Sequence, residues 1–233
     1  MITKPYVVAC IPAYNEEITI AEVHLRACKF ADRVIVCNDG STDSTGEILG
    51  KLDIGVTNHF ERMGKGVALK TLLRVVKDTK ADIIVTLDAD GTHLPEEIPL
   101  LIKPLLESDP ELDPDMVVGS RFMTSDRGVT SAMNYVGNRI FNTLTFMLTG
   151  KRLTDTQSGF RAFKKKLLDD IVVTSKGYEV ESEITIKTLR HGYKIAEVPI
   201  KCGKSYRAPR LNRFRDGFKI FTTIISTFVK SIR

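Results

Sequence analysis

Residues 82–93, with the sequence DIIVTLDADGTH, contain the feature that decides the fold. A short apolar run, Ile83 to Leu87, stops at Asp88, and a second carboxylate follows at Asp90. An apolar run bounded by polar residues is typical of a buried strand in a parallel sheet. Because α/β proteins bind ligands at the carboxyl ends of their strands, we expect both carboxylates at a binding edge.

The backbone between the two carboxylates decides what they can bind. In an extended chain, Asp88 and Asp90 would point to opposite faces of the sheet, whereas a turn at Ala89, made easy by Gly91, would let them converge. Converging carboxylates suit Mg²⁺ or Mn²⁺, which proteins usually bind through one or two carboxylates together with substrate phosphates. A solvated loop is the alternative that this motif alone leaves open.

Strand-like and helix-like segments alternate around this stretch. Apolar runs predict strands at 6–11, 33–37, 82–87 and 115–119, and the segments between them predict helices at 16–30, 42–52, 64–77 and 95–107. This alternation predicts βαβ units and a mostly parallel, Rossmann-like sheet flanked by helices. The pattern loosens after residue 120. There we expect a polar loop and an apolar helix in 121–150, a helix followed by a strand in 178–200, and a final helix over 212–232.

Composition describes an ordinary globular protein. The 233 residues are 42% hydrophobic and 27% charged, and the chain is long enough to bury a substantial core. The 4 cysteines form no C-x-x-C pair, so we expect buried, reduced thiols in a cytoplasmic protein and no zinc site. The start lacks the features of a signal peptide, and no run approaches the about 18 apolar residues of a membrane span.

Positive charge is concentrated at the end of the chain. Residues 201–233 contain nine Lys or Arg residues and one acid, a net charge of +8, so the overall +5 leaves −3 for residues 1–200. A basic segment of this kind suits nucleic acid, an anionic membrane surface or a substrate phosphate, and a solvated charged face is the plain alternative.

The last predicted helix has an apolar stripe at helical spacing, made of Phe214, Phe218, Phe221, Ile225, Phe228 and Ile232. One interpretation is a helix that packs this stripe onto its own core. The stripe is also terminal, rich in aromatics and flanked by cations, which fits a helix lying in a membrane interface. The sequence leaves both interpretations open.

Polar residues also follow the first two predicted strands. Pro12 ends the first strand, in IPAYNEE, and the second ends in CNDGSTDST, where Asp39 begins a turn and Ser41 or Thr42 is a candidate helix N-cap. Plain capping is the simplest interpretation of each loop. A further helix opens at 64–66 with GKG, but neither the P-loop motif nor G-x-G-x-x-G is present.

Seven motifs in this order carry a resemblance to a known family: IPAYNE, NDGSTD, GKG, DADGTH, GSRF, DTQSGFRAF and EVPI. Together they resemble family-2 glycosyltransferases with the GT-A fold, and more narrowly the dolichyl- or polyprenyl-phosphate hexose synthases of the dolichol-phosphate mannose synthase group. The resemblance runs from about Val7 to Gly217. It implies a GT-A catalytic domain over 1–211, followed by a C-terminal amphipathic helix at 212–233, for which a membrane interface is one of the two interpretations above.

The resemblance also implies a donor site. Residues expected to hold a nucleotide sugar, GDP- or UDP-hexose, are Pro12, Ala13, Tyr14, Glu16, Asp39, Lys65, Asp88, Ala89 and Asp90. Asp88 and Asp90 are the implied ligands of Mg²⁺ or Mn²⁺, which would neutralise the leaving nucleoside diphosphate. Thr92 stands where some relatives have a glutamine ligand. We expect His93 to hydrogen-bond to the backbone of its turn rather than to bind metal.

For the acceptor, the implied phosphate ligands are Arg121, Arg139 and Arg207, and Asp90, Arg121 and Arg139 form the implied catalytic set. A lipid phosphate is already ionised near neutrality, so it needs the fork of a guanidinium and no general base. Arg161 is either a further phosphate ligand or a structural residue packed beside Asp155. Glu181 and Glu183 either contact the sugar or are ordinary acids of a helix.

These expectations describe an inverting hexosyltransferase that acts on dolichyl or polyprenyl phosphate and is peripheral on the cytosolic face of a membrane. Two alternatives remain: a family-2 enzyme with a soluble or polysaccharide acceptor, and a catalytically silent nucleotide-binding module. No nucleic-acid partner is expected, because the motifs of such domains are absent.

Overall fold

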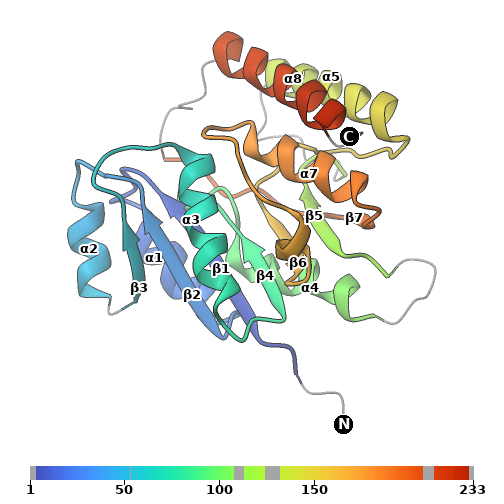
Figure 1. Ribbon diagram of the computed structural model, residues 1–233. Helices are drawn as coiled ribbons and strands as arrows, with labels where there is room; N and C mark the ends of the chain where they lie inside the picture. Colours follow the sequence, from blue (N-terminus) through green and yellow to red (C-terminus); the bar gives the residue numbers. More distant parts are fainter. Residues whose placement is uncertain (1–3, 53, 108–112, 124–131, 207–212, 231–233) are drawn as a thin grey trace.

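The computed structural model describes residues 4–52, 54–107, 113–123, 132–206 and 213–230. Its centre is a seven-stranded sheet with the strand order β3-β2-β1-β4-β6-β5-β7 (Figure 1). The strands are β1 (Val7–Ala13), β2 (Arg33–Asn38), β3 (Gly55–Asn58), β4 (Ile83–Thr86), β5 (Met116–Ser120), β6 (Arg161–Lys164) and β7 (Ile195–Pro199). Neighbouring strands are parallel except at β6, which is antiparallel to β4 and β5. The predicted α/β class with a mostly parallel sheet is confirmed.

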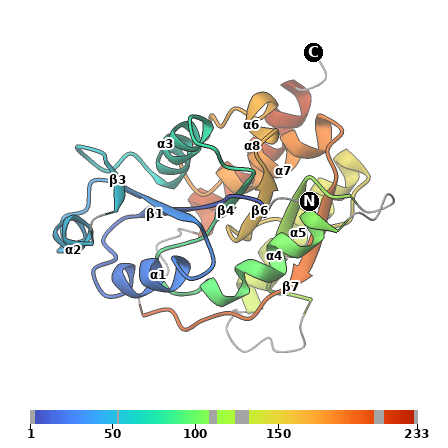
Figure 2. The same cartoon turned by 90° about the horizontal axis from the view of Figure 1, so that it is seen from below.

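Helices cover both faces of this sheet (Figure 2). One face carries α1 (Ile20–Ala27) and α4 (Ile98–Leu106), which follows the 3₁₀ turn η1 (Pro95–Glu97), with α2 (Thr45–Lys51) beside α1. The other face carries α3 (Lys65–Lys77), α6 (Leu167–Asp170) and α7 (Val180–Arg190). Strand β1 is buried between them, with Ala9 and Ile11 in one core and Val8 and Cys10 in the other.

Two further helices, α5 (Ala132–Thr149) and α8 (Arg213–Lys230), pack with α7 at one end of the molecule (Figure 1). In α8, Ile220 and Ile224 are buried against Ile186 of α7 and Phe141 of α5. No helix of the described residues is long and apolar enough to cross a membrane.

The buried face of α8 is not the stripe that the sequence singled out. Phe214 is 91% exposed and Phe218 70% exposed, whereas Ile224 is fully buried. Of the stripe, Phe228 packs partly into the cluster beneath the helix, and Ile232 lies outside the described residues. The helix therefore docks on its own domain by one face and exposes an aromatic face to the surroundings.

Short elements and helix starts depart from the predictions. Strands β3 and β6 have four residues each and contain no long apolar run, so neither was predicted. Helices α1 and α2 begin later than predicted, because the preceding residues join the two loops to each other. Asn15, at φ 52°, donates its backbone N–H to Ser41 Oγ, and its side-chain oxygen accepts the N–H of Thr42.

The predicted N-caps at Ser41 and Thr42 are thus wrong: both residues cross-link loops, and α2 starts at Thr45. The prediction of buried thiols holds for Cys10 and Cys37 but is wrong for Cys28, which is exposed directly after the last residue of α1.

Candidate active site

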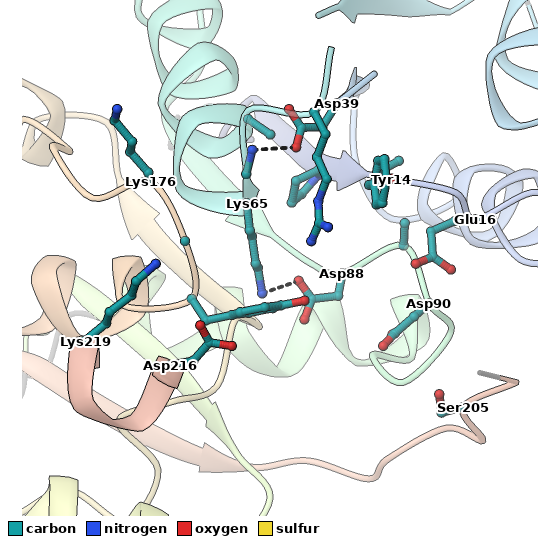
Figure 3. A pocket seen from close by; sticks show the side chains of 18 of the residues that line it. Tyr14, Glu16, Asp39, Lys65, Asp88, Asp90, Lys176, Ser205, Asp216 and Lys219 are labelled. Carbon is teal, nitrogen blue, oxygen red and sulfur yellow. Dashed lines mark hydrogen bonds and ion pairs between the residues drawn. The ribbon is translucent and has the colours of Figure 1, made fainter. Parts of the chain in front are cut away.

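A cavity of about 440 Å³ lies at the carboxyl ends of β1, β2 and β4 (Figure 3). All nine residues predicted to hold the nucleotide sugar line it: Pro12, Ala13, Tyr14, Glu16, Asp39, Lys65, Asp88, Ala89 and Asp90. The lining also includes residues that the sequence motifs did not indicate as ligands, namely Arg62, Gly64, Ala68, Lys176, Gly177, Tyr178, Ser205, Arg215, Asp216 and Lys219. The N-terminal part of α8 therefore forms one wall of the cavity.

Lys65, at the start of α3, lies between two carboxylates. Its Nζ is 2.7 Å from Asp88 Oδ1 and 2.8 Å from Glu181 Oε1. Burial disfavours the ammonium charge, but attraction to Asp88 and Glu181 outweighs it and raises the pKa of Lys65. Burial likewise disfavours ionised Asp88, yet the nearby ammonium outweighs it and lowers the pKa of Asp88 to about 2. At neutral pH this contact is therefore an ion pair.

The glycines of GKG bring a distant loop against Lys65. A side chain at Gly64, where φ is 105°, would collide with the carbonyl oxygen of Lys176, and one at Gly66 would collide with that of Ser175. Instead, the Gly66 N–H donates to Lys176 O over 3.0 Å. Only glycine permits this approach of the loop before α7 to the first turn of α3.

Glu183 holds the same loop from the other side. Its carboxylate accepts the N–H groups of Thr174 and Ser175 at 2.8–3.1 Å and pairs with Lys187 at 2.6 Å. Burial opposes ionisation of Glu183, but these partners outweigh it and lower its pKa. Of the two acids left open by the sequence, Glu183 fixes the loop and Glu181 faces Lys65.

Asp39 has a positioning role in the fold. Its carboxylate, 3% exposed as a residue, accepts the N–H groups of Met63 and Gly64 at 2.9 and 2.8 Å and contacts His59 Nδ1 at 2.7 Å. These bonds fix the loop between β3 and α3. The same loop holds the guanidinium of Arg62 4.5 Å above the ring of Tyr14.

After β4 the backbone turns at Ala89 and Asp90, as in the alternative that lets the two carboxylates converge, and both line the same cavity. Gly91 has φ 80°, and Asp90 Oδ1 accepts both the N–H and the hydroxyl of Thr92, at 3.0 and 2.6 Å. His93 Nδ1 accepts the N–H of Asp88 at 2.9 Å, which confirms its predicted role in the turn. Burial lowers the pKa of His93, so the ring is neutral with its proton on Nε2.

Asp88 and Asp90 offer a divalent ion two carboxylates at the rim of the cavity. Within the described ranges, no group of three His, Cys, Asp or Glu side chains is arranged to hold a metal by itself. Two carboxylates, with the other positions filled by diphosphate oxygens and water, are the donor set that Mg²⁺ commonly takes in nucleotide sites. The residues present therefore fit such an ion bound together with its nucleotide.

Of the predicted acceptor arginines, the two that the structure describes, Arg121 and Arg139, do not line this cavity. Arg121 makes a fork to buried Asp155, with Nε–Oδ2 at 2.7 Å and Nη2–Oδ1 at 2.9 Å. Arg139 is exposed on α5, 6.0 Å from the ring centre of Tyr135. Arg207 lies outside the described residues.

Arg161 is structural, as one of its two interpretations had it. It is 2% exposed and donates to the backbone oxygens of Ser158, Thr156 and Glu181. The hydrogen-bonded partner of Asp155 is Arg121, however, and not Arg161.

Known proteins are similar to this chain in sequence and in architecture. Residues 8–172 match the family model described as glycosyl transferase family 2. Over 238 residues the chain is 34% identical to the UDP-N-acetylglucosamine–dolichyl-phosphate N-acetylglucosaminyltransferase of Methanococcus voltae, covering 92% of this chain and 93% of that protein. Over 214 residues it is 32% identical to the dolichyl-phosphate hexose transferase of Haloferax volcanii, covering 91% and 89%.

A solved structure gives the same fold. Glucosyl-3-phosphoglycerate synthase from Mycobacterium tuberculosis, in complex with Mn²⁺, UDP-glucose and phosphoglyceric acid, matches with a TM-score of 0.78 at 25% identity, over 97% of this chain and 80% of that chain. The architecture is the GT-A fold, and the chain belongs to glycosyltransferase family 2.

Proposed function

We propose that this protein is an inverting glycosyltransferase that moves a hexose from GDP- or UDP-hexose to dolichyl or polyprenyl phosphate. The observation that carries the proposal is the cavity lined by all nine expected donor residues, with ionised Asp88 beside Lys65. Support for the acceptor comes from relatives, similar over nine tenths of this chain, whose names describe transfer to dolichyl phosphate.

The charges around Lys65 favour a donor that arrives with a divalent cation. One ammonium and the carboxylates of Asp88, Asp90 and Glu181 leave a formal net charge of −2, which repels a bare diphosphate. Mg²⁺ or Mn²⁺ held by Asp88 and Asp90 would stabilise the charge of the leaving nucleoside diphosphate. In this chemistry Lys65 keeps the Asp88 carboxylate ionised and in place.

The acceptor chemistry needs no general base, because a phosphate monoester is already a nucleophile near neutrality. His93 is not placed to act as a base, because its Nδ1 already accepts the backbone N–H of Asp88. Arg121, Arg139 and Arg207 remain the proposed ligands of the acceptor phosphate. Arg121 would bind it while anchored by Asp155, through the guanidinium edge that the carboxylate leaves open.

We place the reaction at the cytosolic face of a membrane, with the exposed aromatic face of α8 as the contact. Phe214, Phe218 and Phe221 are 91%, 70% and 42% exposed and lie on the helix that forms a wall of the donor cavity. A lipid acceptor must be reached at the bilayer surface, and an interfacial helix beside the cavity would hold the site there.

A donor and acceptor screen tests the proposal. Purified protein with Mn²⁺ and a panel of GDP- and UDP-sugars is offered farnesyl phosphate or phosphoglyceric acid, and products are scored by mass spectrometry. We expect glycosyl transfer to farnesyl phosphate. Transfer to phosphoglyceric acid alone, the acceptor bound in the matching solved structure, would favour the soluble-acceptor alternative. Nucleotide binding without transfer would favour the silent module.

A further inference from the structure

A second cavity, of about 710 Å³, lies between α7, α8 and the loop before α7. Its wall on α8 is a polar stripe at helical spacing, Lys219, Thr223, Ser226, Thr227 and Lys230. The opposite wall is also mostly polar, with Thr174, Ser175, Lys187 and Arg190 among its residues. Such a lining suits a hydrophilic ligand and offers little to a polyprenyl chain.

Formal charge differs sharply between the two cavities. The donor cavity is balanced, with five cations and five acids: Arg62, Lys65, Lys176, Arg215 and Lys219 against Glu16, Asp39, Asp88, Asp90 and Asp216. The lining of the second cavity has five cations and two acids, Lys176, Lys187, Arg190, Lys219 and Lys230 against Asp170 and Glu179. Its formal charge is +3, or +2 when Glu183, which pairs with Lys187, is counted. An anion is therefore attracted first to the second cavity.

Lys176 and Lys219 line both cavities and mark the boundary between them (Figure 3). Among the described residues, neither ammonium forms an ion pair, whereas Lys65 and Lys187 each face a carboxylate within 3 Å. For Lys176 the acid nearest in sequence is Glu179, whose carboxylate accepts the backbone N–H groups of Lys176 and Gly177. For Lys219 it is Asp216, about one turn earlier on α8. Two lysine charges thus remain available at the boundary.

The polar stripe faces away from the exposed aromatic face of α8. At about 100° per residue, Phe214, Phe218 and Phe221 lie about 140°, 100° and 160° around the helix from Lys219. With the aromatic face on a bilayer, the second cavity opens toward water. Its ligand is therefore a soluble anion and not a lipid headgroup.

We propose that the cavity between α7 and α8 is an entry site that captures the phosphates of the nucleotide sugar and delivers them to the donor cavity past Lys176 and Lys219. The inference rests on the proposed function, because it requires a nucleotide donor. It separates the two substrates in space: the donor arrives from the water side of α8 and the lipid from the aromatic side.

The test is the association rate of mant-GDP and mant-UDP, measured by stopped-flow fluorescence with Mg²⁺ present. Lys230 belongs only to the second cavity, so Lys230→Glu should lower kon about threefold at low ionic strength and leave koff unchanged. At about 0.5 M salt the difference should vanish, because exposed charges are screened. Lys230→Arg should keep the wild-type kon.

The matched control is Lys29→Glu, the same charge change at an exposed residue that lines neither cavity, and its kon should stay near wild type. Normal equilibrium binding with an unchanged kon in Lys230→Glu would overturn the inference and spare the proposed function. A raised KM for farnesyl phosphate with unchanged kon would assign the cavity to the acceptor and also overturn it. Failure of wild type to bind either nucleotide would overturn the proposed function itself.

Discussion

The two sides of the candidate site are held in different ways. On the donor side, polar side chains are fixed by several partners each: Asp39, after β2, by three contacts and Lys65, at the start of α3, by two carboxylates. On the other side, α8 is attached by a small cluster around Ile220 and Ile224 and exposes Phe214 and Phe218. The donor side is thus preorganised by the fold, whereas the α8 side has a smaller attachment and an exposed aromatic face.

On the donor side, Lys65→Met should cause the largest loss of folding stability. The substitution leaves Asp88 and Glu181 without their shared cation, and removing one partner of a buried ion pair costs about 3–5 kcal/mol of stability. Chemical denaturation measures this loss. Lys70→Met, at an exposed position of the same helix, is the control and should change stability by less than about 0.5 kcal/mol.

The stability difference between wild type and Lys65→Met should also depend on pH, which gives a sharper test. The pKa of Asp88 is about 2 in the folded protein, below its ordinary 3.8, so the ion pair stabilises the fold above about pH 4. This contribution is lost as the pH falls through 4 toward 2. The difference in the free energy of unfolding between wild type and Lys65→Met should therefore become smaller over this range. A difference that does not change with pH would contradict the ion pair.

Asp90→Ala tests whether the preorganised side holds a divalent ion. Loss of one ligand should raise the barrier for sugar transfer by about 2–4 kcal/mol, as for other electrostatic stabilisers of a transition state. The fold should survive, because within the described part of the chain Asp90 Oδ1 bonds only to Thr92, in its own turn. Steady-state rates with Mg²⁺, with Mn²⁺ and with chelator measure the effect. Full wild-type activity in chelator would exclude the metal role.

Substitutions in the buried face of α8 should lower the stability of the fold, whereas substitutions in its aromatic face should not. Ile224→Ala removes a fully buried side chain and should cost about 2–3 kcal/mol, whereas Phe218→Ala, at a side chain that is 70% exposed, should cost less than about 0.5 kcal/mol. Thermal unfolding of both variants gives the comparison. Equal losses would mean that the aromatic face is covered within the protein.

Arg139→Lys examines the acceptor side. If the guanidinium binds the acceptor phosphate, a point charge in place of a fork should cost about 1.5 kcal/mol in kcat/KM for farnesyl phosphate, the worth of one charged hydrogen bond. Calorimetry with the nucleoside diphosphate should show unchanged affinity. Equal losses in both assays would move Arg139 to the donor side.

The contrast between the two sides also explains how far the sequence could be interpreted. Buried parallel strands leave apolar runs, and their carboxyl ends meet at one edge, so the sequence alone was enough to place Asp39 and Asp88 together. Strands β3 (GVTN) and β6 (RAFK) have the same length as β4 (IIVT) but contain no apolar run, so they leave no such signal. The spacing of GKG was visible, but the loop that its glycines admit, at Ser175 and Lys176, comes from far along the chain.

Helical periodicity likewise found the stripe of α8 but not its buried face. Two neighbouring stripes satisfy the spacing, and burial of Ile220 and Ile224 is decided by Ile186 and Phe141 on other helices. Tertiary packing likewise decides that the hydrogen-bonded partner of Asp155 is Arg121 and not Arg161. Local pattern predicts elements, while the partner of a side chain depends on packing between elements.

The smallest expected effect on stability, and the most direct test of the α8 side, is the double variant Phe214→Asp with Phe218→Asp. Both side chains are exposed, so the fold should lose less than about 0.5 kcal/mol. Flotation with liposomes that contain anionic lipid should be lost, because two apolar side chains are replaced by carboxylates that the anionic surface repels. Each basic residue near such a surface contributes about 1 kcal/mol of attraction, so raised salt should weaken wild-type flotation as well.

The matched control is Leu25→Asp with Leu100→Asp, two apolar positions on α1 and α4 that are 56% and 47% exposed and lie on the other face of the sheet. This pair should float like wild type while carrying the same change in charge. Phe228 is left unchanged, because it packs into the cluster under α8 and its loss would disturb the attachment of the helix. If wild type does not float, or if the control pair loses flotation equally, the aromatic face of α8 is not a membrane contact and its exposure points to a protein partner instead.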